Sequence, residues 1–137
     1  MDKNISLELS KYRLSQANDC LCAAENNFGA GFLKDALNRS YYCIFHCMRA
    51  ILALDRFDSK KHSGIIAEFR RSYIKTGKFA PHFSGTIGNS FELRNSSDYE
   101  DFYVVAKEDV VQQISNAKEF MAVATAYVEK FAEDTGE

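Results

Sequence analysis

Apolar residues recur at helical spacing along almost the whole chain, and this periodicity restricts the possible folds more than any other feature. The widest stripe lies between positions 32 and 52 and consists of Phe32, Leu33, Ala36, Leu37, Tyr41, Ile44, Phe45, Met48, Ile51 and Leu52. A stripe of this width is typical of a helix that faces a core. No alternation of period two is long enough to build a sheet. The sequence therefore predicts an all-α fold.

Four further helices are expected from the remaining stripes. The first spans about 5–28, with Ile5 and Tyr12 on its apolar side; the third opens near Ser63 and ends at Gly77; a weaker fourth spans 84–95, and the last spans 107–131. Helices joined by such short breaks predict an antiparallel bundle of four to five helices. A chain of 137 residues is long enough for one domain. We expect a single domain over 1–137, with a core from about 4 to 131.

Composition restricts the cellular setting and the kinds of site. No run approaches the roughly 18 apolar residues of a membrane span, and the charged start MDKNISLELSKYR lacks an apolar export core. We therefore expect a cytoplasmic protein without a membrane segment.

Cys43 and Cys47, with His46 beside them, are a conceivable metal cluster, but a structural site needs a fourth ligand. Buried free thiols explain the four cysteines better, Cys20 and Cys22 included. We expect no metal and no cofactor.

Charge is unevenly distributed along the chain. Residues 1–97 carry 14 Lys or Arg against 9 Asp or Glu, whereas residues 98–137 carry 3 against 10. The densest basic stretch is Lys60, Lys61, Arg70, Arg71, Lys75 and Lys78. Such a stretch can contact phosphates. It can equally be a solvated helix face that the acidic C-terminal helix neutralises.

A row of polar side chains flanks the widest apolar stripe. Arg39, Tyr42, His46 and Arg49 follow one another at spacings of three, four and three, which places them on one helix face. Two guanidinium groups, a phenol and an imidazole can hold an anion. The alternative is that the arginines pair with acids of the C-terminal helix and that His46 is a half-buried packing residue.

The stretch FELRNSSDYEDF at 91–102 is a polar break after an apolar run. Asn95, Asp98 and the serines between them are turn-forming residues, so a simple turn explains much of it. Turn chemistry does not explain the permanently charged Arg94. His62 stands beside two lysines just before an expected helix N-terminus, a setting suited to anions, although it can also be a packing residue. We interpret His82, next to Pro81, as incidental.

Three blocks together resemble the HEPN superfamily of small helical domains: NRSYYCIFHCMRAILAL at 38–54, KKHSG at 60–64 and FELRNSSDYEDFY at 91–103. The resemblance spans nearly the whole chain and is strongest to small stand-alone prokaryotic members. It implies a helical bundle that pairs as a homodimer. In ribonuclease members, an Arg-polar-x(3 to 5)-His motif from each subunit forms one composite site. Arg94 and Asn95 match its first half, but Tyr99 stands where the His is expected.

This resemblance implies several functions. A phenol is a poor general base at neutral pH, so we favour an RNA- or nucleotide-associated module, non-catalytic or weakly active. Family members of this type are often paired with a small nucleotidyltransferase in toxin–antitoxin systems. The first alternative is a metal-independent RNA endonuclease that uses Arg94 and Tyr99, with or without an imidazole from His46 or His62. The second is a purely structural dimeric interaction protein. The candidate catalytic residues are thus Arg94 and Tyr99, and the candidate binding residues are Asn95, Asp98, His62, Arg39, Tyr42, His46 and Arg49.

Overall fold

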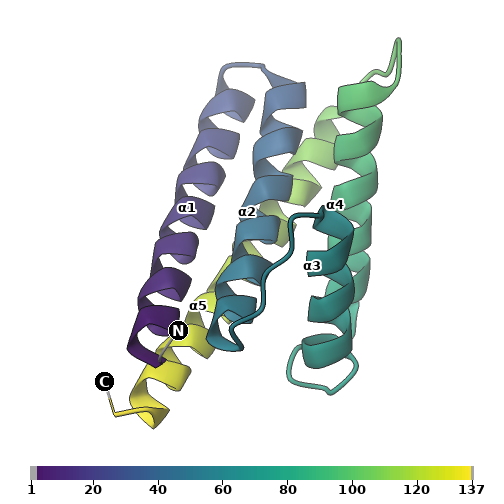
Figure 1. Ribbon diagram of the computed structural model, residues 1–137. Helices are drawn as coiled ribbons and strands as arrows, with labels where there is room; N and C mark the ends of the chain where they lie inside the picture. Colours follow the sequence, from purple (N-terminus) through teal and green to yellow (C-terminus); the bar gives the residue numbers. More distant parts are fainter. Residues whose placement is uncertain (1–2, 137) are drawn as a thin grey trace.

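The protein folds into a bundle of α-helices, as the computed structural model shows for residues 3–136 (Figure 1). Its elements are α1 (Lys3–Gly29), α2 (Leu33–Leu54), α3 (His62–Phe69), the π-helical turn η1 (Arg70–Ile74), α4 (His82–Tyr99) and α5 (Lys107–Asp134). No strand occurs among these residues. The predicted all-α bundle and its order of helices are confirmed.

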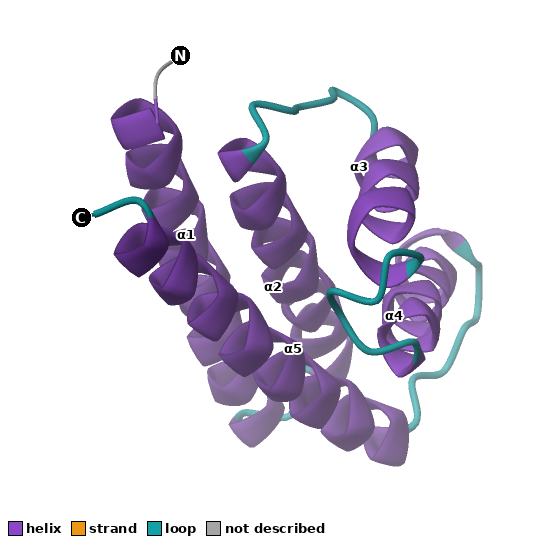
Figure 2. Cartoon of the chain, turned by 90° about the horizontal axis from the view of Figure 1, so that it is seen from below, coloured by secondary structure: helices purple, strands orange, loops and turns teal. Residues whose placement is uncertain are grey.

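Helix α2 is the centre of the bundle. It packs against α1 on one side and against α3 and α4 on the other, and α5 crosses it, as two perpendicular views show (Figures 1 and 2). Its apolar stripe is buried almost throughout, with Tyr41, Ile44, Met48 and Ile51 each no more than 1% exposed. Because it contacts every other α-helix, residues of α2 can meet residues from distant parts of the chain.

Helix α1 buries a different face from the one that its apolar pattern predicts. Ile5 and Tyr12 are exposed, at 52% and 62%. Most residues of its buried line are small, and the line recurs alternately at four and three positions: Ser6, Ser10, Arg13, Ala17, Cys20 and Ala24. Leu7 is also buried. Small side chains let α1 approach the bulky face of α2 closely, so residue size and not hydropathy selects the inward face.

Helix α4 is longer than its sequence indicates. It begins at His82 and continues through Asn95 and Asp98 to Tyr99, so the predicted polar turn is wrong and these residues form the last helical turn. Two contacts stabilise that turn. Asp98 pairs with Arg94 at the i,i+4 spacing, and it accepts a hydrogen bond from Asn38 of α2.

The third helix ends in a π-helical turn that the sequence does not reveal. After α3, the backbone widens over Arg70–Ile74, and Lys75 N donates to the carbonyl of Arg70 at 2.9 Å. Gly77, at φ +82°, follows and ends the segment near the predicted position. Such π-turns are rare and often occur at functional sites.

Three of the four cysteines are buried free thiols, as expected, namely Cys20, Cys43 and Cys47; Cys22 is exposed. In the part of the chain that the structure describes, no group of three or more His, Cys, Asp or Glu side chains is placed to hold a metal ion. No helix between residues 3 and 136 has the length and apolar character to span a membrane.

Candidate functional site

Arg94 lies at the centre of a cluster of tyrosines between α2 and α4. Its side chain is 13% exposed, its Nη2 donates to the hydroxyl of Tyr42 at 3.2 Å, and its Nε lies 2.9 Å from Oδ2 of Asp98. The guanidinium carbon is 5.3 Å from the ring centre of Tyr41, 5.4 Å from that of Tyr42 and 5.6 Å from that of Tyr99. The rings and the carboxylate together hold the cation in place.

Asp98 links Arg94 to a second arginine. Asn38 donates from Nδ2 to Oδ2 of Asp98 at 3.1 Å, and its own Oδ1 accepts from Nε and Nη2 of Arg39 at 3.0 and 2.6 Å. The Arg39 guanidinium also lies 5.0 Å from the Tyr42 ring centre. Both guanidinium groups therefore contact Tyr42, Arg94 pairs with Asp98 directly and Arg39 is linked to it through Asn38, so two cations face one carboxylate.

His62 reaches this cluster from the start of α3. Its Nδ1 lies 2.8 Å from the hydroxyl of Tyr41, and its ring stacks on Phe45 with centres 4.1 Å apart. Burial raises the pKa of Tyr41, so its hydroxyl keeps its proton and can donate to Nδ1. The pKa of His62 is lowered by burial and then by the charges of Arg94 and Arg49. The imidazole is therefore neutral at neutral pH.

His46 and Arg49 lie further along α2. The Nδ1 of His46 is buried without a hydrogen-bond partner. Burial first, and then neighbouring cations led by Arg49, lower the pKa of His46 to about 4. Arg49 pairs with Asp58 of the α2–α3 connection at 3.4 Å. The predicted alternative, in which the arginines of this row pair with the C-terminal helix, is therefore wrong for Arg49.

The same aspartate, Asp58, contacts a second arginine. Buried Arg13 of α1 contacts Oδ2 of Asp58 at 3.3 Å and donates to the carbonyl oxygen of Arg49 at 3.1 Å. These contacts fix the connection that carries Lys60 and His62. A hollow of about 330 Å³ lies there, with Arg49, Lys60 and His62 in its lining. Its cationic lining, offset by Asp58, suits an anion.

Beyond Arg94, the chain presents aromatic side chains to solvent. Tyr99 is 72% exposed at the end of α4. The loop that follows projects beyond the bundle (Figure 1) and carries Phe102, which is fully exposed and has a positive φ of 62°. A left-handed backbone at an aromatic residue is unusual. Here it leaves the Phe102 ring in solvent.

The structure brings most of the predicted site residues together. Arg94, Tyr99, Asp98, Tyr42, Arg39 and His62 belong to one cluster. Asn95 lies half-buried beside Arg94, and His46 and Arg49 extend the row along α2. Sequence reasoning assigned Tyr41 to the core only and missed its link to His62. The consecutive tyrosines at 41 and 42 are the sequence signal that could have pointed to a role for Tyr41 in the site.

Other predicted basic residues lie outside this cluster. Arg71 pairs with Glu68 of its own segment at 2.6 Å, and Arg70 donates to the carbonyl of Ser84 in α4 at 2.9 Å. His82 contacts Glu119 at 3.4 Å and packs on Phe83. Within the basic stretch, Arg70 and Arg71 therefore contact partners outside the Arg94 cluster.

Known proteins similar to this chain share its length and pattern. One relative, named "Putative toxin MJ0142", from Methanocaldococcus jannaschii, is 27% identical over 128 residues, which cover 93% of this chain and 86% of the relative. A "UPF0332 protein" from Thermotoga maritima is 31% identical over 127 residues, 93% of each chain. A second M. jannaschii protein, "Putative toxin MJ0605", is 31% identical over 99 residues, 72% of this chain and 73% of the relative.

The family model of the HEPN domain matches residues 10–127. That range runs from the first half of α1 to the last turns of α5 and includes every residue of the Arg94 cluster. The protein belongs to the HEPN family.

Proposed function

We propose that this protein is the RNA-associated member of a two-component, toxin–antitoxin-like pair, which works as a homodimer in the cytoplasm with a small nucleotidyltransferase as its partner. The observation that carries the RNA-binding part is the position of Arg94 among Tyr41, Tyr42 and Tyr99. Membership of the HEPN family and relatives with toxin names support the two-component part. Buried free thiols suit a reducing compartment.

The proposed ligand is single-stranded RNA. Proteins that bind single strands combine cations, which contact phosphates, with aromatic rings on which bases stack. Arg94 and Arg39 supply the cations, and the exposed rings of Tyr99, beside Arg94, and of Phe102, in the following loop, supply stacking surfaces. Arg49 and Lys60 continue the cationic lining past Tyr41, beside the neutral ring of His62.

Phosphate binding at Arg94 competes with an internal carboxylate. Asp98 occupies one side of the guanidinium, and the phenol of Tyr42 accepts from another. An incoming phosphate has either to displace Asp98 from the guanidinium of Arg94 or to bind that guanidinium beside Asp98. The site is therefore expected to bind RNA weakly in the free protein and strongly only when Asp98 is neutralised or moved.

A second candidate function is RNA endonuclease activity, which one contact favours. His62 is joined to Tyr41 at 2.8 Å, and Arg94 lies over the ring of that same tyrosine. A neutral imidazole with a lowered pKa is the form that a general base requires. His62 would then abstract the proton of a 2′-hydroxyl, whose oxygen attacks the phosphorus while the P–O5′ bond breaks and the leaving 5′-oxygen takes a proton from water. Arg94 would stabilise the charge on the phosphate. In this mechanism Tyr99 positions the strand.

The deciding experiment incubates total cellular RNA with the purified protein and with its Arg94→Ala, His62→Ala and Tyr99→Phe variants. Arg71→Ala is the matched control, because Arg71 is an exposed arginine outside the cluster. Fragments from wild type that disappear in Arg94→Ala and His62→Ala establish an endonuclease. Intact RNA that is retarded by wild type, and less so by Arg94→Ala, establishes a binding protein. RNA that is neither cut nor retarded overturns both functions.

The partner requires its own test. Co-expression with a small nucleotidyltransferase from the same genome should yield a complex that survives size-exclusion chromatography, or a covalent mass increase on the HEPN chain. If neither occurs, the two-component part of the proposal is wrong and the RNA result is unaffected. The mass of the protein alone in solution tests the homodimer.

A further inference from the structure

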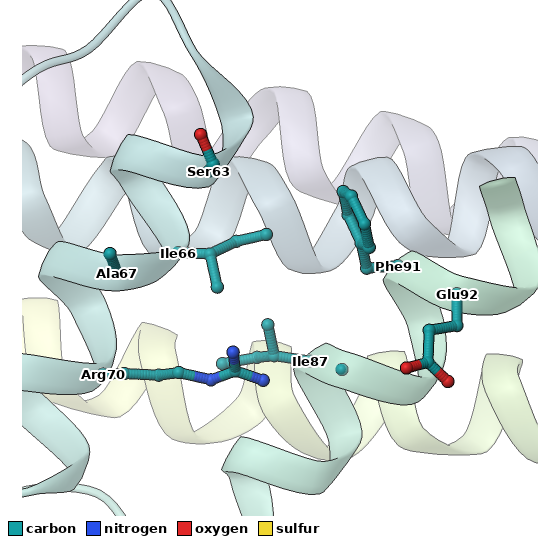
Figure 3. A pocket seen from close by; sticks show the side chains of 8 residues that line it. Ser63, Ile66, Ala67, Arg70, Ile87, Phe91 and Glu92 are labelled. Atoms are coloured by element: carbon teal, nitrogen blue, oxygen red, sulfur yellow. The ribbon is translucent and has the colours of Figure 1, made fainter.

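A hollow outside the Arg94 cluster opens between α3 and α4. Its volume is about 340 Å³, within the range of small-molecule sites. Ile66, Ile87 and Phe91 give it apolar walls, and Arg70 and Glu92 are its charged members. In Figure 3, the Arg70 and Glu92 side chains reach toward Ile87 from opposite sides, with Phe91 above.

The backbone around Arg70 is adapted to hold its guanidinium here. Arg70 is the first residue of the π-helical turn η1. Its Nη2 donates to the carbonyl of Ser84 at 2.9 Å, while its Nε is buried with no hydrogen-bond partner. A Cβ at Gly88 would come within 3.1 Å of Nη2, so glycine leaves room for the guanidinium.

We infer that this hollow is a guanine subsite, which rests on the proposed RNA-binding function and deepens it. Guanine carries two acceptors, O6 and N7, on one edge, the pair that an arginine fork recognises best. Its N1–H and N2–H groups are donors on another edge, where Glu92 can accept them. Adenine places an N6 donor beside N7 and would present an N–H to Arg70. Cytosine and uracil are smaller and lack N7.

The hollow lies close enough to Arg94 for one strand to use both. Phe91 is three residues before Arg94 on α4, about one helical turn. The Phe91 ring centre lies 6.1 Å from that of Tyr41, the ring over which Arg94 lies. A base in the hollow and a phosphate at Arg94 can therefore belong to neighbouring positions of one RNA. The cluster would supply affinity, and the hollow would supply base preference.

Fluorescence anisotropy with three RNA decamers tests this. Each is oligoadenosine except at one central position, which holds guanosine, inosine or adenosine; inosine lacks only the N2 amino group. Wild type should bind the guanosine decamer about tenfold tighter than the adenosine decamer, with inosine between them. Glu92→Gln should reduce the guanosine–inosine difference to within about twofold. Gly88→Ala, which pushes on Arg70, should reduce the preference over adenosine. Glu129→Gln, an exposed acid on α5, is the matched control.

The outcomes separate this inference from the proposed function. Arg94→Ala should weaken all three complexes by a similar factor and leave their ratio unchanged. If wild type binds the three decamers equally while Arg94→Ala weakens them all, the guanine subsite is overturned and RNA binding stands. If no decamer binds, RNA binding is overturned.

Guanosine and adenosine 5′-monophosphates are then titrated while the methyl NMR signals of Ile66 and Ile87 are followed. Shifts with guanosine monophosphate only, lost in Glu92→Gln, support the subsite; no shifts overturn it.

Discussion

Arg94 donates a hydrogen bond to the hydroxyl of Tyr42, 52 positions away in the chain, and this contact joins α4 to the central helix α2. Because Arg94 is also paired with Asp98 within α4, the same guanidinium stabilises a helix end and an interface between helices. The residue that the proposed function assigns to phosphate is thus also part of the packing of the bundle.

Tyr42→Phe removes the acceptor from this contact and leaves the ring in place. The Arg94 side chain is mostly covered, so its Nη2–H loses a partner that water replaces incompletely. We expect the free energy of unfolding to fall by about 1 kcal/mol. Urea denaturation measures this, and Tyr12→Phe is the control, because Tyr12 is an exposed tyrosine of α1. Equal effects of the two substitutions would show that the hydrogen bond contributes nothing.

Asp98→Asn should increase affinity for RNA while reducing stability. The amide can still accept from Asn38, but it no longer neutralises Arg94. An incoming phosphate then meets an uncompensated guanidinium, and we expect Kd to fall about fivefold, close to 1 kcal/mol. Loss of the i,i+4 pair should lower the unfolding free energy by about 0.5 kcal/mol.

The salt dependence of binding gives the Asp98 test a second readout. An additional phosphate contact should steepen the plot of log Kd against log salt by about 0.7. Asp101→Asn removes one exposed acid from the neighbouring loop and serves as the control for net charge. An unchanged slope in Asp98→Asn, or an equal gain in Asp101→Asn, would mean that Asp98 does not compete with the ligand.

The sequence predicts the bundle well because the apolar stripes of α2 and α5 are long and regular. It does not predict the end of α4, since Asn95 and Asp98 are turn-forming residues locally and the last turn is held helical by the contacts of Asp98 with Arg94 and with Asn38 of another helix. It misplaces Ile5 of α1 because close helix packing there selects small residues.

The candidate site is predictable in its residue types but not in its connections. The resemblance of the stretch at 91–103 to HEPN proteins predicts Arg94 as a site residue, and helical spacing places Tyr42 on one face of α2 with Arg39, His46 and Arg49. The contact between His62 and the hydroxyl of Tyr41 depends on the path of the α2–α3 connection, which brings the start of α3 back to α2. Arg13 and Asp58 hold that connection by contacts between distant segments. No local pattern contains this information.

The stability of the protein should fall between neutral pH and pH 5 because of His46. Its pKa is lowered to about 4 by burial and by Arg49, Arg39, Arg13 and His62, against about 6.5 in the unfolded chain. Between these values the unfolded chain binds the proton more tightly, so the contribution of neutral His46 is present above about pH 6.5 and is lost as pH falls toward 4.

After allowance for solvent screening, we expect the His46 effect to be on the order of 1 kcal/mol at pH 5. Urea denaturation at pH 7 and pH 5 should show a smaller loss for His46→Gln than for wild type. His82→Gln should behave like wild type, because His82 is exposed on another helix. An identical pH dependence in wild type and His46→Gln would contradict the burial of the neutral ring.

The ends of α1 and α2 should respond in opposite ways to substitution at equivalent positions. After α1, Phe32 N donates a hydrogen bond to the carbonyl of Asn27, and the residue just before Phe32 is Gly31, whose φ is +86°. After α2, Phe57 N bonds to the carbonyl of Leu52 in the same pattern. Here the left-handed position is held by Arg56 at φ +59°. Both are Schellman endings, in which this position favours glycine.

Arg56→Gly should therefore raise the free energy of unfolding by about 1 kcal/mol, because it removes the steric cost of a Cβ in the left-handed region. Gly31→Ala should lower it by about the same amount, although nothing lies within 4 Å of the added Cβ. Gly85→Ala, inside α4 with equally open surroundings, is the control and should stabilise by about 0.5–1 kcal/mol. Urea denaturation of the three variants measures all three signs. A loss of stability in Arg56→Gly would mean that its side chain contributes more than the backbone strain costs.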